Sequence, residues 1–167
     1  SKTLEIYGSL SHSFSPRREG LIVWPETAVP FFFQEAGEKS RGILQIAKSS
    51  GNWLLIGSPS YTQGPKGTAF FNSAFLLSPD GAINGRYNKV HLVPYGEYVP
   101  LRKFFPFINK LVVGVGDFQE GEGYQPLDMR DRKVGVLICY EGIFPEAARI
   151  YKERGANLLI NITNDAW

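Results

Sequence analysis

Short apolar runs alternate with amphipathic segments along this chain, and their spacing predicts both strands and helices. Runs of four to nine apolar or β-branched residues, bounded by Gly, Pro, Asn or Asp, indicate strands. Apolar positions recurring every three or four residues indicate helices. We expect helices at residues 3–10, 35–50 and 145–154, and strands at residues 21–24, 53–57, 69–77, 82–87, 124–129, 133–138 and 157–162.

Turn and stop signals set the boundaries of these elements. Pro25 ends the first strand, which reads as fully buried, and Gly51 ends the second helix. Residues 78–81, Ser-Pro-Asp-Gly, predict a hairpin turn between two of the central strands. Because strands alternate with helices near the ends and pair as hairpins in the middle, the pattern predicts a mixed α/β sheet with helices on its faces.

Residues 88–123 carry little regular pattern and are rich in Pro, Gly and aromatic residues. A segment of this length inside a compact domain is usually functional or disordered, and its aromatic content argues against disorder. The glycines at 114 and 116 do not lie between a strand and a helix, so the segment gives no support for a nucleotide-binding loop.

Composition narrows the class of protein. With 167 residues, 43% hydrophobic and 20% charged, the chain is predicted to form one globular domain, residues 1–167. A net charge of +2 gives no reason to expect a nucleic-acid partner. The one cysteine and two histidines show no ligand spacing, so a metal site is not expected. No run approaches the roughly 20 apolar residues of a membrane-spanning helix, and no signal peptide is visible, so the chain is expected to be soluble or at most surface-associated.

Three polar residues follow apolar strands in similar local settings, and together they form a candidate catalytic set. Glu26 follows Trp24-Pro25, Lys89 follows the strand ending at Tyr87, and Cys139 follows Ile138. The ends of strands are where catalytic groups gather in α/β sheets. A thiol needs a base to become a nucleophile, which Glu26 could provide. Lys89 could supply positive charge to an oxyanion.

Each of these residues also has a purely structural interpretation. Free cysteines are commonly buried, so Cys139 could be a core residue. Glu26 could satisfy free N–H groups at a helix start, and Lys89 could be a solvated surface amine. Glu97 is either a second acid or a brace for its loop. His91 suggests a Cys–His pair, although a structural role is favoured.

Taken together, these motifs resemble the carbon–nitrogen hydrolase (nitrilase) superfamily, whose Glu, Lys and Cys occur in this chain order. The matching segments are Pro25-Glu26, Tyr87-Asn88-Lys89-Val90-His91-Leu92 with Gly96-Glu97, and Cys139-Tyr140-Glu141 with Phe144-Pro145-Glu146. The resemblance implies an α-β-β-α sandwich of mixed sheets flanked by helices. It also implies that Glu26 is the general base, Lys89 the oxyanion-stabilising amine, Cys139 the nucleophile and Glu97 a further required acid. Tyr140 and Glu141 match supporting positions beside the nucleophile.

Within the superfamily the chain is most similar to the branch that N-acylates bacterial apolipoproteins. The features are Trp24-Pro25-Glu26-Thr27-Ala28, residues 93–100 and the ending Asn161-Ile162-Thr163-Asn164-Asp165-Ala166-Trp167. The resemblance implies a phospholipid acyl donor, a Cys139 thioester, a diacylglyceryl apolipoprotein acceptor and no cofactor. Apolar residues 104–113 would then be an acyl-binding or membrane-dipping lid, or ordinary packing.

That branch also implies a setting for the domain. Its members lie in the bacterial inner membrane, with this domain on the periplasmic side, and carry transmembrane helices that are absent from this sequence. We therefore expect a partial catalytic domain, truncated at both ends. Two alternatives stay open: a soluble amidase that uses the same Glu26, Lys89 and Cys139 with water as second nucleophile, and a non-catalytic interaction module that retains only the fold.

Overall fold

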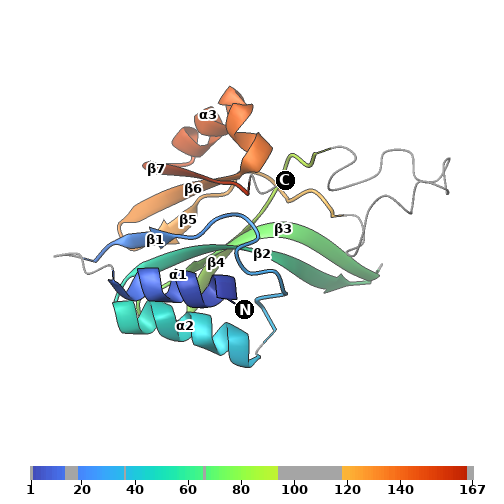
Figure 1. Ribbon diagram of the computed structural model, residues 1–167. Coiled ribbons are helices and arrows are strands. Elements are labelled where there is room, and N and C mark those ends of the chain that lie inside the picture. Colours follow the sequence, from blue (N-terminus) through green and yellow to red (C-terminus); the bar gives the residue numbers. More distant parts are fainter. Residues whose placement is uncertain (1, 14–18, 36, 66, 94–117, 165–167) are drawn as a thin grey trace.

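The computed structural model describes residues 2–13, 19–35, 37–65, 67–93 and 118–164. Two β-sheets lie face to face, with helices α1 (Lys2–Ser13) and α2 (Glu38–Ser50) outside one sheet and α3 (Pro145–Glu153) outside the other (Figure 1). This is the expected α-β-β-α layering, and it places helices on the outer faces and an apolar core between the sheets.

The first sheet has the strand order β1-β2-β3-β4. Its strands are β1 (Leu21–Val23), β2 (Trp53–Gly64), β3 (Gly67–Leu77) and β4 (Ile83–Asn88). β1 runs parallel to β2, and the other neighbouring pairs are antiparallel. The expected turn joins β3 to β4, with the Ser78 N–H donating to the Ala82 carbonyl at 2.9 Å. The hairpin prediction for these two strands is therefore confirmed.

The second sheet has the order β5-β6-β7 and carries the cysteine. β5 (Leu127–Met129) is antiparallel to β6 (Arg132–Ile138), which is parallel to β7 (Leu158–Ile162). A 3-10 turn, η2 (Cys139–Ile143), follows β6 directly and leads into α3. The chain therefore leaves β6 through a tight turn before the helix begins, whereas the sequence pattern predicted only the strand and the helix.

Two apolar clusters hold the layers together. One fills the space between the sheets and extends beneath α3, and the other packs α1 and α2 against the outer face of the first sheet. Successive side chains of a strand point to opposite faces of the sheet, so β2 and β3 contribute alternate residues to the two clusters. The inter-sheet cluster includes Trp53, Leu55, Ala74, Leu76, Tyr87, Val134, Val136 and Ile138.

Two expectations about the strands were wrong. β1 was predicted to be fully buried, but it lies at the edge of its sheet and Val23 is 42% exposed. The second predicted strand ended at Gly57, whereas β2 continues to Gly64 and forms a long hairpin with β3. Gly57 and Pro59 interrupt the apolar pattern there, although the strand stays largely buried as far as Ser60, and residues 62–64 at its far end are exposed. Among the described residues, no helix is both long and apolar enough to cross a membrane.

Candidate active site

Glu26 lies in the turn that follows β1, where the chain passes over Gly57, inside β2. Its side chain is 10% exposed, and no helix begins at this position, so the helix-start interpretation is wrong. The Asn72 side-chain amide donates to its Oε1 atom at 2.8 Å, and the Asn164 backbone N–H donates to its Oε2 atom at 3.1 Å. Both carboxylate oxygens are thus held by donors from distant parts of the chain.

Lys89 follows β4 and is 1% exposed, which rules out a solvated surface amine. Its Nζ atom lies 3.9 Å from Glu26 Oε1. Its backbone N–H donates to the Asn72 carbonyl and its own carbonyl accepts from the Gly121 N–H, both at 2.8 Å. A buried ammonium requires an opposite charge or several acceptors, and Glu26 provides that charge. The structure therefore brings together two of the three predicted catalytic residues.

Cys139 is the first residue of η2, directly after the last residue of β6, and is partly buried. Its φ of 55° lies in the left-handed region, which is unusual for a residue with a side chain. Strained backbone of this kind, in a sharp strand-to-turn junction, is common at functional sites. The Asn161 side-chain amide donates to the Cys139 carbonyl at 3.2 Å and so contributes to this turn.

The buried carboxylate of Glu141 joins the strand before Cys139 to the segment after Lys89. Its Oε1 atom accepts the backbone N–H groups of Val90 at 2.7 Å and His91 at 3.0 Å, and its Oε2 atom accepts that of Ile138 at 2.8 Å. Val90, next to Lys89, and Ile138, next to Cys139, therefore both donate hydrogen bonds to the Glu141 side chain. This contact places the Lys89 segment against the end of the second sheet.

A second contact joins the segment after β7, which runs beside Cys139, to Glu26. Ile138 is the parallel partner of Ile162 in the β6–β7 register, so Cys139 and Thr163 leave their strands side by side. The next residue, Asn164, donates its backbone N–H to Glu26. The two contacts together bring the segments that carry all three residues to one end of the space between the sheets.

Burial governs the protonation of the groups around Glu141. The Tyr87 hydroxyl donates to both Glu141 oxygens, at 2.8 and 3.0 Å. Burial raises the pKa of the Glu141 carboxyl, although its four hydrogen-bond donors oppose that shift. Burial, reinforced by the charge of Glu141, also raises the pKa of Tyr87. The hydroxyl therefore stays protonated and continues to donate to the carboxylate over a wide pH range.

The other residues predicted for the site are Tyr140, His91 and Glu97, and the structure describes the first two. Tyr140 is 43% exposed and contacts Phe144 edge to face, with ring centroids 5.2 Å apart. His91 packs its ring on Phe144, and its Nδ1 atom is 2.7 Å from the Tyr124 hydroxyl, in keeping with the structural role favoured for it. Glu97 and the apolar segment 104–113 lie outside the described residues.

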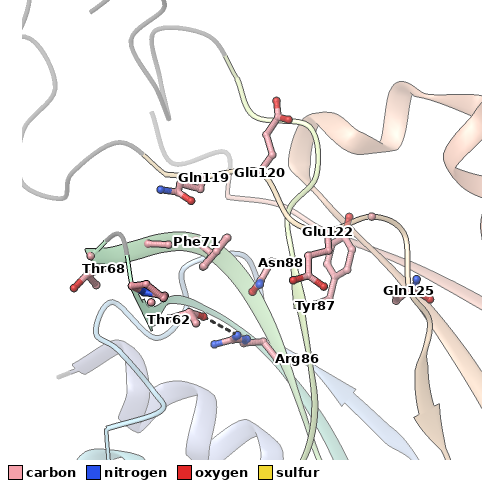
Figure 2. Close-up of a pocket in the computed structure, with 15 residues that line it drawn as sticks. Thr62, Thr68, Phe71, Arg86, Tyr87, Asn88, Gln119, Glu120, Glu122 and Gln125 are labelled. Atoms are coloured by element: carbon pink, nitrogen blue, oxygen red, sulfur yellow. Dashed lines mark hydrogen bonds between the residues drawn. The ribbon is translucent and has the colours of Figure 1, made fainter. Parts of the chain in front are cut away.

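A separate open pocket of about 760 Å³ lies beside the far half of the β2–β3 hairpin (Figure 2). Residues of β2, β3, β4 and the segment 119–125 line it, and the Arg86 guanidinium in its wall donates to Thr62 Oγ1 at 3.3 Å. Glu26, Lys89 and Cys139 do not contribute to this pocket. No group of three or more His, Cys, Asp or Glu side chains that could hold a metal occurs in the part of the chain that the structure describes.

Two residues that contact the Glu26 turn or its side chain were missed at the sequence level. Gly57 lies under the Glu26 turn, where a Cβ atom would come within 2.5 Å of the Pro25 carbonyl oxygen. Asn72 contacts both Glu26 and Lys89. Both residues are visible in the sequence as breaks in the apolar pattern, since Gly57 ends an apolar run and Asn72 interrupts one. Such breaks usually indicate loops or solvent-facing positions, so they did not single out these two residues.

Comparison with known proteins agrees with this architecture. The family model described as carbon-nitrogen hydrolase matches residues 3–167. Apolipoprotein N-acyltransferase from Geobacter metallireducens is 46% identical over 99% of this chain, and the one from Nitrosomonas europaea is 38% identical over 99%. The chain spans 32% of the length of each of these relatives.

Solved structures show the same fold. A carbon-nitrogen hydrolase from Helicobacter pylori G27 superposes with a TM-score of 0.67 at 25% identity, covering 97% of this chain and 54% of that one. A mutant amidase of the nitrilase superfamily from Nesterenkonia AN1 gives 0.66 at 23% identity, covering 99% and 61%.

Proposed function

The chain belongs to the carbon–nitrogen hydrolase family, and we propose that it is the acyl-transfer domain of an apolipoprotein N-acyltransferase. The observation that carries a catalytic role is the buried pair of Glu26 and Lys89, with 3.9 Å between the carboxylate and the amine. Relatives of 46% and 38% identity that bear that name support the choice of reaction.

In the proposed first step, Glu26 removes the thiol proton of Cys139, and the thiolate attacks the ester carbonyl carbon of a phospholipid. The carbonyl oxygen becomes an oxyanion, which the Lys89 ammonium stabilises through its charge. Collapse of the tetrahedral intermediate breaks the carbon–oxygen bond. The departing alkoxide of the lysophospholipid takes the proton from Glu26, and the acyl group remains on Cys139 as a thioester.

In the proposed second step, the α-amine of a diacylglyceryl-cysteine at the N-terminus of an apolipoprotein attacks the thioester carbonyl. Glu26 accepts the proton released by the amine, the thiolate of Cys139 leaves, and Glu26 then returns that proton to the thiolate. The product is an amide, which is more stable than the thioester. Every atom is accounted for without a metal or another cofactor.

The buried setting suits this chemistry for an electrostatic reason. Lys89 and Glu26 lie at the polar end of an otherwise apolar inter-sheet face, where charges are screened less than in water. A fixed ammonium there stabilises a developing oxyanion without solvent rearrangement. We assign Glu141 a supporting role, since its hydrogen bonds hold the Lys89 and Cys139 segments together. Glu97 retains its proposed role as a further acid.

The proposed location follows from the proposed substrates. A phospholipid donor and a lipid-modified acceptor are both held in a membrane, so the domain would work at the bacterial inner membrane of the full-length protein, on its periplasmic side. The non-catalytic interaction module is disfavoured, because a binding module gains nothing from burying an ammonium beside a carboxylate.

Product analysis tests the reaction. The chain in its natural full-length context is incubated with phospholipid vesicles and a diacylglyceryl peptide, and in parallel with small aliphatic amides. We expect an N-acylated peptide and a lysophospholipid in equal amounts, and neither in Cys139→Ala. Ammonia from the amides without any acylated peptide would show an amidase instead.

A further inference from the structure

Asn72 contacts both members of the proposed catalytic pair. It lies on β3, two residues before Ala74, and so shares the face that β3 turns toward the second sheet. Its side-chain amide donates to Glu26 Oε1 at 2.8 Å, and its backbone carbonyl accepts the Lys89 N–H at 2.8 Å. A single residue of a central strand therefore fixes one carboxylate and one end of the lysine segment.

We propose that Asn72 is a positioning residue that sets the orientation of the Glu26 carboxylate for proton transfer with Cys139. This inference rests on the proposed function, because it assumes that Glu26 is the base. The Asn72 amide holds Oε1 on the side of Lys89, while the Asn164 N–H holds Oε2 from another direction. Two donors from separate elements fix the plane of the carboxylate.

The chemistry of an amide explains why asparagine suits this position. Its NH₂ group donates without carrying charge, so it neither competes with Lys89 for Glu26 nor repels the ammonium. An aspartate there would place a second carboxylate beside Glu26, and an alanine would remove the donor from Oε1. Each carboxylate oxygen accepts more than one hydrogen bond, so the bound Glu26 still has room for the thiol proton.

The test compares Asn72→Ala and Asn72→Asp, which preserves the side-chain shape, with Asn84→Ala. Asn84 is a matched control, because it is an exposed asparagine of β4 whose amide donates to the Asp128 carbonyl at 2.6 Å. All variants are made in the full-length protein. Single-turnover transfer of an acyl group from phospholipid to Cys139 gives a rate constant and an amplitude for each variant.

A positioning role lowers the rate constant about 10-fold to 100-fold at full amplitude, because displaced reacting groups slow a step while leaving the site intact. A merely structural role lowers the amplitude, as protein is lost to unfolding, and leaves the rate constant unchanged. The half-saturating phospholipid concentration should not change with a positioning role. Wild-type rate constants in both Asn72 variants would overturn the inference.

Alkylation of Cys139 by iodoacetamide separates this inference from the proposed function, since it needs no lipid. Glu26→Gln and the two Asn72 variants should slow alkylation together, and Asn84→Ala should not. If the wild type takes no acyl group from phospholipid but this pattern holds, the proposed reaction fails and the role of Asn72 stands. If Glu26→Gln slows alkylation and neither Asn72 variant does, the role of Asn72 is wrong.

Discussion

Gly57 and Glu26 approach each other so closely that a Cβ atom on Gly57 would lie 2.6 Å from the Cα atom of Glu26. The same added atom would meet the backbone of Pro25 and Thr27 at 2.5 and 2.7 Å. Backbone does not yield as a flexible side chain does, so the turn that carries the proposed base needs a glycine on the neighbouring strand. The Val29 N–H donates to the Gly57 carbonyl at 3.0 Å and fastens the turn from the other side.

Gly57→Ala should therefore displace the Glu26 turn. We expect a loss of about 1–3 kcal/mol in the free energy of unfolding, as for other overpacked sites, together with a large loss of acylation activity. Denaturant unfolding and acylation of Cys139 measure the two effects. Gly42→Ala is the control, because its added Cβ meets nothing within 4 Å on the surface of α2. Similar stability changes in both variants would show that the close approach is unimportant.

Glu141→Gln should destabilise the fold and separate the Lys89 and Cys139 segments. An amide keeps one acceptor oxygen, so it cannot satisfy the N–H groups of both Val90 and Ile138 as the carboxylate does. Each buried donor left without a partner costs about 1–3 kcal/mol. Thermal unfolding of this variant is compared with that of Glu146→Gln, which changes an exposed glutamate of α3. An equal melting temperature in the two would contradict the role given to Glu141.

The backbone of Cys139 predicts a stability difference between two inactive variants. With φ at 55°, any residue bearing a Cβ is strained here, and glycine is not. Cys139→Gly should be more stable than Cys139→Ala by about 1 kcal/mol. Both variants lack the thiol, so their difference in the free energy of unfolding reports the backbone strain at this position. Chemical denaturation measures that difference. A Cys139→Ala protein of equal or greater stability would show that the turn is relaxed.

Three buried tyrosines predict a loss of stability in alkali. Burial raises the pKa of Tyr124 to about 12 from about 10, and also raises those of Tyr87 and Tyr151. Above pH 10 the unfolded chain therefore releases protons that the folded chain retains, so the free energy of unfolding falls as pH rises from about 10 to 12. Denaturant titrations at several pH values measure this free energy of unfolding. In Tyr124→Phe, it should fall less steeply with pH than in the wild type. A free energy that stays constant up to pH 11 would contradict this.

The positions of the candidate residues at the ends of strands could be predicted from sequence, because each residue follows an apolar run with a clear end. Cys139 after Ile138 and Glu26 after Pro25 stand where the pattern placed them. The burial of Lys89 could not be predicted, since a lone lysine after a strand is ordinarily solvated and its contacts with Glu26 and Asn72 come from distant parts of the chain. The same holds for Glu141, whose four partners lie three to 54 residues away.

The strand errors have a related cause. The pattern ended β2 at Gly57 because a glycine and then Pro59 broke the apolar alternation. In the fold that glycine is required by the Glu26 turn rather than by a chain reversal. Asn72 also interrupts an apolar run, that of β3, but the expected strand at 69–77 includes it, and its amide donates to Glu26. The local rule therefore fails at Gly57, where the close contact with the Glu26 turn determines the residue.

The proposed acyl-enzyme gives the most direct test of the account. Full-length protein is mixed with phospholipid without an acceptor, and its intact mass and digested peptides are measured by mass spectrometry. We predict one added acyl group on the peptide that contains Cys139, removable by neutral hydroxylamine, absent in Cys139→Ala and strongly reduced in Glu26→Gln and Lys89→Met. An acyl group on another residue, or one that persists in Cys139→Ala, would contradict the assignment of Cys139 as the nucleophile.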